Sequence, residues 1–349
     1  MQKSFAKLLG LATGAYATRR SLRGGPGYRG PKSDHFDGET FFNPDASAGR
    51  NFGDFLRWQH TSRATPWPRW VENRAVPSLP AALEPGEIAL TFVNHITYLL
   101  QFRGLNVLTD PVWSERVSPV QWTGPRRVRA PGLAIEALPR IDVVLVSHNH
   151  YDHLDLDTLL RLERDHRPLF LTGLGNRAFL EERGLGEVRE FDWWEETLHG
   201  GARFTYTPAQ HWSGRSLQGR NHTLWGGFVI EADGRKVFFA GDTGYWRHFR
   251  DLRERLGMVD VAMLPIGAYE PRWFMREQHI NPAEAVQVHR DLGARRSLGV
   301  HWGTFALTDE ALDAPPRELA RARHAAGLAD DDFFVLAVGK TRQLPRRRR

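Results

Sequence analysis

Short apolar runs typical of β-strands alternate with longer amphipathic segments typical of helices from about position 77 onward. The run 141–147 is almost wholly apolar, which indicates a strand covered on both faces. Further strands are predicted at 88–93, 105–109, 168–172, 203–207, 224–231, 237–240, 259–264 and 297–301. Helices are predicted at 156–164, with Asp155 available as its cap, at 245–256, and after Asn281-Pro282.

This mixture of elements predicts the fold class. Asp233-Gly234 favours a hairpin turn between two of the strands, so the strands do not all run parallel. Mixed strands with interspersed helices predict an α/β sandwich, in which two sheets pack together and helices cover them. We expect one domain over residues 41–338, and we expect its aromatic-rich start, 41–73, to wrap around the rest. Residues 1–40 are predicted to be a basic, poorly ordered leader and linker, and 339–349 a basic C-terminal tail.

Composition narrows the chemistry that the chain can perform. With 349 residues, 41% hydrophobic and 25% charged, it has the balance of a soluble globular protein. It contains no cysteine, which excludes disulfides, thiolate metal sites and cysteine nucleophiles. Any metal site must therefore use histidine, aspartate and glutamate.

The net charge of +6 comes from the two ends of the chain. Seven basic residues precede the first acidic one, Asp34, and four arginines close the sequence, so the body holds 36 of the 47 basic residues and all 41 acidic ones. A nucleic-acid enzyme usually carries its positive charge on the folded body, so we expect no nucleic-acid partner. The basic ends suit either peripheral contact with an anionic membrane or simple solvation.

The beginning of the chain leaves two interpretations of its location open. Residues 8–17 form a weakly apolar run that ends in Ala15-Tyr16-Ala17, a pattern similar to a signal-peptidase site. The run is too short to span a bilayer and is interrupted by Gly10 and Gly14. We expect a cytoplasmic protein that can lie at the membrane surface, and export through a weak signal is the alternative.

Four potential metal ligands fall within six residues, directly after the predicted strand 141–147: His148, His150, Asp152 and His153. Side chains alternate along an extended chain, so His148 and His150 point to the same side. The turn that follows can bring Asp152 and His153 to a second point nearby. Two metals a few ångströms apart can use all four side chains, and zinc suits these donors. The alternative is a polar loop with ordinary surface histidines. In that case the spacing of three histidines beside an aspartate would be a coincidence.

Three further candidate ligands stand at the ends of predicted strands. His211 follows 203–207, Asp242 follows 237–240, and His301 ends 297–301. A side chain at a strand end is held by the sheet and faces the rim where loops form a site. A single histidine of this kind often only packs, but together the three residues supply the coordination that two metals lack.

The order H-x-H-x-D-H, then His, Asp and His, resembles the metallo-β-lactamase superfamily. Flanking segments resemble one branch more closely, the N-acyl-phosphatidylethanolamine-hydrolysing phospholipases D and their bacterial relatives. These segments are 108–111 (LTDP), 147–155 (SHNHYDHLD), 208–215 (PAQHWSGR), 272–275 (RWFM) and 301–307 (HWGTFAL). The resemblance covers residues 41–338, and nothing in residues 1–40 is shared.

The resemblance implies a metallo-β-lactamase-type αββα sandwich with two Zn²⁺ per chain. It places His148, His150 and His211 on one zinc, Asp152, His153 and His301 on the other, with Asp242 bridging them. It also places His279 near the metals, and it implies catalytic roles for Asp152 and His279. The apolar, arginine-bearing stretch 269–276 is a candidate lining for lipid chains and a phosphate.

The implied reaction is hydrolysis of a phosphodiester, with a phospholipid such as N-acyl phosphatidylethanolamine as substrate and partner. Two functions remain as alternatives. A lactonase would use the same metals against a carbonyl carbon. A non-catalytic, membrane-associated protein would hold metal only for folding, although a structural zinc normally closes its shell with four ligands. A dimer is possible on sequence grounds.

Overall fold

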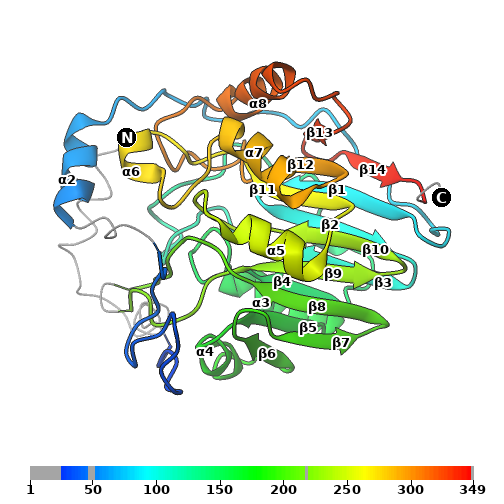
Figure 1. Cartoon of the computed structure of the whole chain (residues 1–349), viewed down its shortest axis with the longest axis horizontal. Helices are drawn as coiled ribbons and strands as arrows, with labels where there is room; N and C mark the ends of the chain where they lie inside the picture. Colours follow the sequence, from blue (N-terminus) through cyan, green and yellow to red (C-terminus); the bar gives the residue numbers. More distant parts are fainter. Residues whose placement is uncertain (1–24, 46–51, 217–218, 347–349) are drawn as a thin grey trace.

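Two seven-stranded β-sheets lie face to face within residues 25–45, 52–216 and 219–346, which are the residues that the computed structural model describes (Figure 1). The strands of the first sheet are β1 (Ile88–Asn94), β2 (Thr97–Phe102), β3 (Leu105–Thr109), β4 (Val143–Val146), β5 (Leu169–Gly173), β6 (Val188–Phe191) and β14 (Thr341–Leu344). The strands of the second are β7 (Glu196–His199), β8 (Ala202–Thr207), β9 (Gly227–Ala232), β10 (Arg235–Phe239), β11 (Val261–Pro265), β12 (Arg296–Val300) and β13 (Phe333–Phe334).

Both sheets are mixed. The strand orders are β14-β1-β2-β3-β4-β5-β6 and β13-β12-β11-β10-β9-β8-β7. In the first sheet β1, β2, β3 and β14 pair antiparallel, whereas β3 to β6 pair in parallel. In the second, β7 to β10 are antiparallel and β10 to β13 parallel. The predicted mixed sheets are therefore confirmed.

Alternation along the strands explains why the sheets stack. In β4, Val143 and Leu145 belong to the core between the two sheets, whereas Val144 and Val146 belong to a second core on the outer face. Successive side chains of a strand point to opposite faces, so a strand that is apolar throughout needs cover on both sides. The wholly apolar run in the sequence thus predicted a strand in the middle of a layered structure.

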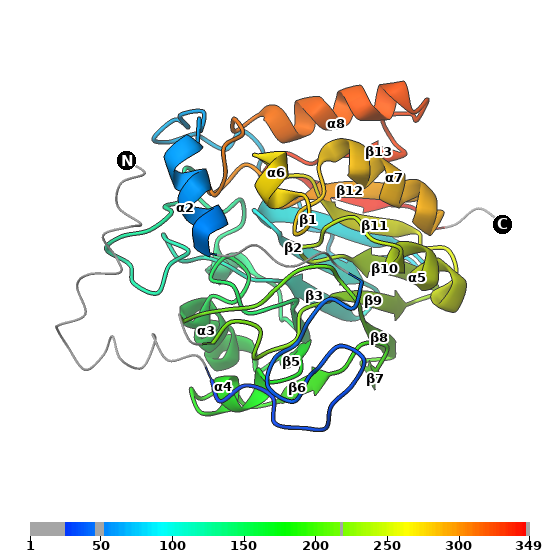
Figure 2. The ribbon, with the colours of Figure 1, turned by 60° about the vertical axis from the view of Figure 1, so that its left-hand side comes forward.

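Helices provide the outer cover. They are α2 (Phe52–Thr61), α3 (Leu156–His166), α4 (Arg177–Glu181), α5 (His248–Leu256), α6 (Arg272–Met275), α7 (Pro282–Leu292) and α8 (Ala314–Ala325), with a short 3₁₀ helix at Ile135–Ala137. Leu159 of α3 and Phe179 of α4 pack on the first sheet, and α5, α7 and α8 pack on the second (Figure 2). The result is the predicted αββα sandwich. No described helix has the length and apolar character that crossing a bilayer requires.

Two helix starts show how well local signals predict structure. Asn281 caps α7 through its side chain and Glu284 closes a capping box, with Pro282 in the first turn, as the sequence suggests. Asp155 stands at the N-cap of α3, but its side chain does not cap that helix. Its carboxylate instead accepts hydrogen bonds from the backbone N–H groups of Trp113 and Ser114, so a long-range contact replaces the predicted local one.

The predicted C-terminal tail is wrong for residues 341–344. They form β14, which pairs antiparallel with β1 and extends the first sheet. The segment is polar and short, with Thr341 and Arg342 partly exposed, so its composition gives no sign of a strand. Edge strands of this kind take their structure from the backbone of their neighbour rather than from their own side chains.

Residues 25–45, here called the N-terminal strap, lie against the rims of both sheets. Phe36 and Phe41 are buried in the core between the sheets. The buried ring of His35 contacts Asp192 at 2.7 Å and stacks on Trp193. The prediction of a poorly ordered leader up to residue 40 is therefore wrong for this part of the chain. The apolar run 8–17 and the last three arginines lie outside the described residues.

Replacing Phe36 by alanine tests whether the strap belongs to the core. Because Phe36 is 1% exposed, we expect Phe36→Ala to lower the free energy of unfolding by about 3–5 kcal/mol. Phe42→Ala is the matched control, since Phe42 is 38% exposed and its loss should cost about 1 kcal/mol or less. Urea denaturation of both variants measures the difference, and equal losses would show that the strap contributes nothing specific.

Candidate metal centre

All seven predicted ligands meet at one rim of the sandwich. His148, His150, Asp152 and His153 occupy the loop between β4 and α3 in the first sheet. The second sheet supplies His211 after β8, Asp242 after β10 and His301 after β12. Five of the seven are almost fully buried, and His150 and Asp152 are partly exposed. The structure thus brings together residues that are up to about 150 positions apart in the sequence.

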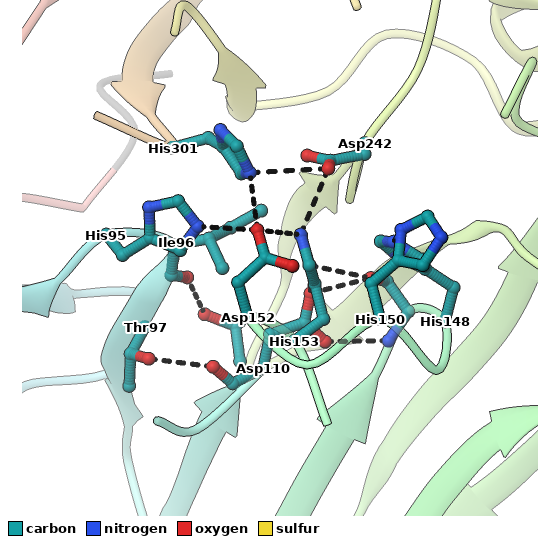
Figure 3. A network of polar contacts seen from close by, with 12 residues as sticks. His95, Ile96, Thr97, Asp110, His148, His150, Asp152, His153, Asp242 and His301 are labelled. Atoms are coloured by element: carbon teal, nitrogen blue, oxygen red, sulfur yellow. Dashed lines mark hydrogen bonds and ion pairs between the residues drawn. The ribbon is translucent and has the colours of Figure 1, made fainter. Parts of the chain in front are cut away.

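The donor atoms form two groups around Asp242 (Figure 3). In the first group His150 Nδ1 lies 2.8 Å from His148 Nε2 and 3.3 Å from His211 Nε2. In the second group Asp152 Oδ2 lies 3.4 Å from both His153 Nε2 and His301 Nε2. Asp242 Oδ2 is near both groups, at 3.0 Å from His153, 3.3 Å from His301 and 3.8 Å from His211.

These separations match what zinc requires. Tetrahedral zinc with bonds of about 2.0–2.1 Å places its ligand atoms about 3.3–3.4 Å apart. Several of the buried donor atoms, among them His153 Nε2, His301 Nε2 and Asp242 Oδ1, make no hydrogen bond among the described residues. Because a buried polar atom without a partner is costly, a bound cation would satisfy atoms that the protein alone leaves unsatisfied. The residues therefore suit a bound metal ion.

Other buried groups fix the orientation of the ligands. Asp110 accepts a hydrogen bond of 2.7 Å from His153 Nδ1, which leaves His153 Nε2 for the cluster. Asp110 also accepts from the backbone N–H and the hydroxyl of Ser147. His211 Nδ1 donates to the carbonyl oxygen of Gln278 at 2.9 Å, and because burial lowers the pKa of His211 to about 4, the ring is neutral and its Nε2 carries no proton. Such outer contacts set the tautomer of a ligating histidine.

The N-terminal strap also supports a ligand. The side chain of Asn43 donates to the carbonyl oxygen of His211 at 2.8 Å and accepts from its N–H at 3.2 Å. Asn43 Oδ1 also accepts from Trp225 Nε1. The amide thus holds the backbone of His211 from both sides, although it lies 168 positions away in the sequence.

A glycine is required just before the shared carboxylate. Gly241 has a φ of +62°, and a Cβ there would lie 2.7 Å from the Cβ of Ser147. Both the backbone conformation and the lack of space exclude a side chain. Gly241 therefore allows β10 to turn so that Asp242 enters the cluster.

The two groups differ in protonation when no metal is bound. Burial holds the pKa values of His148 and His150 well below the usual range and lowers that of His211 to about 4. Burial would also lower the pKa of His301, but Asp242 and Asp152 raise it to about 9. Neutral rings in the first group offer their lone pairs directly, whereas His301 must lose a proton before it can bind a metal.

His279 lies beside the cluster. Its Nε2 is 3.9 Å from Asp242 Oδ2, and its ring centroid is 5.1 Å from that of His211. Burial lowers its pKa to about 3, so the ring is neutral at pH 7. His279 thus lies within reach of two candidate ligands, Asp242 and His211.

Arg272 does not serve the phosphate site suggested by the sequence. Its guanidinium donates to the carbonyl oxygens of Tyr269 and His279 and pairs with Glu284 at 2.8 Å. These contacts hold the loop that leads to His279. An arginine in an apolar stretch suggested a group that binds a phosphate. In the structure the N–H groups of Arg272 are instead taken up by backbone carbonyl oxygens and by Glu284.

Three residues that contact the candidate ligands were not predicted as part of the site: His95, Asp110 and Asn43. Asp110 entered the sequence comparison only through the segment 108–111 (LTDP). His95 directly follows β1, so the signal that singled out His211 and His301 applies to it as well. It lies in the turn between β1 and β2, with Nε2 3.1 Å from Asp152 Oδ2. Nothing local in the sequence distinguishes Asn43.

Sequence comparison assigns the family. The beta-lactamase superfamily domain matches residues 105–302. The chain belongs to the metallo-β-lactamase superfamily. It is 39% identical over 265 residues to N-acyl-phosphatidylethanolamine-hydrolyzing phospholipase D 1 of Caenorhabditis elegans, covering 72% of this chain and 74% of that protein. This metallo-β-lactamase-fold chain is also 37% identical over 279 residues to the mitochondrial enzyme of the same name from Saccharomyces cerevisiae, covering 75% of this chain and 58% of the yeast protein.

Solved structures agree with the superfamily fold. Igni18, a metallo hydrolase of Ignicoccus hospitalis, aligns with a TM-score of 0.58 at 23% identity, covering 75% of this chain and all of the other. An isothiocyanate hydrolase from Delia radicum gut bacteria aligns with a TM-score of 0.59 at 20% identity, covering 73% of this chain and 98% of that one. The family, the two phospholipase D relatives and the buried His/Asp cluster make this metallo-β-lactamase-fold protein a metal-dependent hydrolase.

The raised pKa of His301 predicts how the stability of the metal-free protein depends on pH. A histidine whose pKa rises from 6.5 in the unfolded chain to about 9 in the folded one stabilises the fold fully below pH 6.5. This contribution, on the order of 3 kcal/mol, is lost as the pH rises through about 9. Urea denaturation of the chelator-treated protein should therefore show falling stability between these values.

Asp242→Asn is the comparison for this experiment, because Asp242 is the main group that raises the pKa of His301. The metal-free variant should lose less stability over the same pH range. A wild-type stability that stays constant or increases between pH 6.5 and 9 would contradict the assigned charge of His301.

Proposed function

We propose that this chain is a zinc-dependent phosphodiesterase that hydrolyses N-acyl phosphatidylethanolamine or a similar phospholipid and holds two zinc ions per chain. His148, His150 and His211 would hold one zinc, Asp152, His153 and His301 would hold the other, and Asp242 would contribute to both. The observation that carries the choice of substrate is the 39% identity to the nematode phospholipase D over 265 residues. The tetrahedral spacing of the donor atoms supports the choice of metal.

When bound, the two zinc ions would supply an activated water near neutral pH and polarise a phosphoryl oxygen. The protein contributes position and charge. Burial alone would raise the pKa values of Asp152 and Asp242, but His153 and the neighbouring histidines hold them well below the usual range. Both carboxylates are therefore ionised at pH 7 and offset the charge of two cations.

His279 acts on the substrate as a neutral ring. With a pKa of about 3 it is not a proton source at pH 7, so we prefer hydrogen bonding to a phosphoryl oxygen over protonation of the leaving alkoxide. A donor aimed at developing negative charge in a dry site stabilises the transition state. The oxygen of the water adds to phosphorus, the bond from phosphorus to the ethanolamine oxygen breaks, and a proton of the same water passes to that oxygen, which gives phosphatidic acid and an N-acylethanolamine.

A lipid substrate fits the surface beside His279. Helix α6 ends at Met275, whose carbonyl oxygen accepts the hydrogen bond of the His279 N–H. The neighbouring α2 stacks Trp58 on Phe274 of α6 and leaves Leu56 50% exposed. The exposed Leu56, on the helix that packs against α6, would be available to contact an acyl chain. The basic ends of the chain would add attraction to an anionic membrane.

A substrate panel tests the proposed reaction. Zinc-loaded protein is incubated with N-acyl phosphatidylethanolamine in mixed micelles, with bis-p-nitrophenyl phosphate and with an acyl lactone. We expect cleavage of the phospholipid, with phosphatidic acid and N-acylethanolamine identified by mass spectrometry. Cleavage of the lactone with both phosphodiesters intact would make the chain a lactonase. Zinc binding without turnover of any substrate would favour the non-catalytic alternative.

Two variants show whether turnover comes from this site. His279→Ala should keep its zinc but lose at least about 100-fold in kcat, because it removes a group that touches the substrate rather than a ligand. Asp242→Asn should lose zinc and activity together. Normal turnover by His279→Ala would remove His279 from the mechanism and leave the metal assignment standing.

A further inference from the structure

His95 occupies an unusual position in the fold. Asn94 of β1 pairs with Thr97 of β2, so His95 and Ile96 form the turn of this hairpin. His95 has a φ of 49°, a left-handed backbone conformation that residues other than glycine rarely adopt. It is 1% exposed and belongs to a turn that reaches across to the second sheet. A buried, polar residue held in a strained conformation often marks a functional site.

His95 contacts two of the ligands assigned to the second zinc. Its Nε2 lies 3.1 Å from Asp152 Oδ2, and its carbonyl oxygen accepts a hydrogen bond of 2.9 Å from the N–H of His301 (Figure 3). The rings of His95 and His301 lie 4.0 Å apart, centroid to centroid. The N–H of His95 in turn donates to Thr304 Oγ1 at 2.9 Å, which ties the turn to the loop that follows His301. His95 thus links the side chain of Asp152, which follows β4 of the first sheet, to the backbone of His301, which follows β12 of the second sheet.

The donor set indicates which role His95 plays. Asp152 Oδ2, His153 Nε2, His301 Nε2 and Asp242 Oδ2 already provide four donor atoms, and four of their separations lie between 3.0 and 3.4 Å. His95 Nε2 lies closer to Asp152 Oδ2 than either of the other two histidines does, at the length of a hydrogen bond. Its Nδ1 is buried and has no hydrogen-bond partner within the described part of the chain. A proton on Nε2, donated to the carboxylate, accounts for these contacts.

We propose that His95 is a positioning residue for the second zinc. It holds the carboxylate of Asp152 by donating a hydrogen bond to it, and it holds His301 through the backbone. This inference rests on the proposed function, because it presumes the assigned zinc ligands. Loss of a group that orients metal ligands typically lowers metal affinity about 10–100-fold. The affinity for the first zinc should stay unchanged. No hydrogen bond among the described residues joins the His95 side chain to His148, His150 or His211.

Cobalt binding provides a test that does not depend on activity. Co²⁺ is titrated into the metal-free full-length protein and the two dissociation constants are obtained from the visible absorption of the bound ion. In His95→Ala, one dissociation constant should rise about 10–100-fold while the other stays within about threefold. Anomalous scattering from crystals of the cobalt-loaded variant should show the loss at the position of Asp152, His153 and His301.

Two further variants separate positioning from general stability. His95→Gln keeps an N–H donor on a side chain of similar reach and should recover part of the lost affinity. If His95→Ala does not fold, the dissociation constants of His95→Gln still test the positioning role. His248→Ala is the matched control, because His248 is equally buried at 1% exposure but lies on α5 among Trp246 and Phe249. It should leave both dissociation constants unchanged, whatever it does to the urea midpoint.

The outcomes distinguish this inference from the function it rests on. Two unchanged dissociation constants in His95→Ala would overturn the positioning role, as would equal weakening of both. Complete loss of one cobalt ion in both His95→Ala and His95→Gln would make His95 a ligand instead. If the wild-type protein binds fewer than two cobalt ions, the proposed dinuclear centre itself fails.

Discussion

The carboxylate of Asp242 lies between His153, His211 and His301, within 3.0–3.8 Å of each and almost fully buried. A buried charge of this kind is tolerated only when opposite charge lies beside it. In the metal-free protein, protonated histidines of the second group supply that charge, and two cations would supply more of it. The geometry of the rim, the protonation of its side chains and its chemistry all follow from this shared carboxylate.

The αββα architecture explains how so many ligands reach one point. Strand ends from both sheets open onto the same rim, and each assigned ligand stands in the loop after such an end. The residues that hold these ligands in place come from elsewhere. Asn43 belongs to the N-terminal strap, His95 to the turn between β1 and β2, and Asp110 follows β3. Asn43 and His95 precede residue 105, where the match to the superfamily domain begins.

The predictable features were those with a local signal. The pattern of apolar and polar positions predicted most strands in the middle of both sheets, although not β2 between β1 and β3, and the spacing from His148 to His153 predicted the candidate metal-binding loop. Phe36, β14 and Asn43 could not be predicted, because each acquires its role through a contact with a distant segment. Asp155 shows the same limit. Its position at the start of α3 was predicted correctly, but no local pattern indicated the hydrogen bonds that its carboxylate accepts from the backbone of residues 113–114. His95 is different, since its place at a strand end was a usable signal.

The central claim is that two zinc ions share Asp242, and zinc content measures it most directly. Protein purified and dialysed against metal-free buffer is analysed by mass spectrometry, beside the variant Asp242→Asn prepared in the same way. The account predicts about two zinc ions per wild-type chain and well below one in the variant, because the shared carboxylate serves both positions. One zinc or none in the wild type, or an unchanged zinc content in Asp242→Asn, would contradict it.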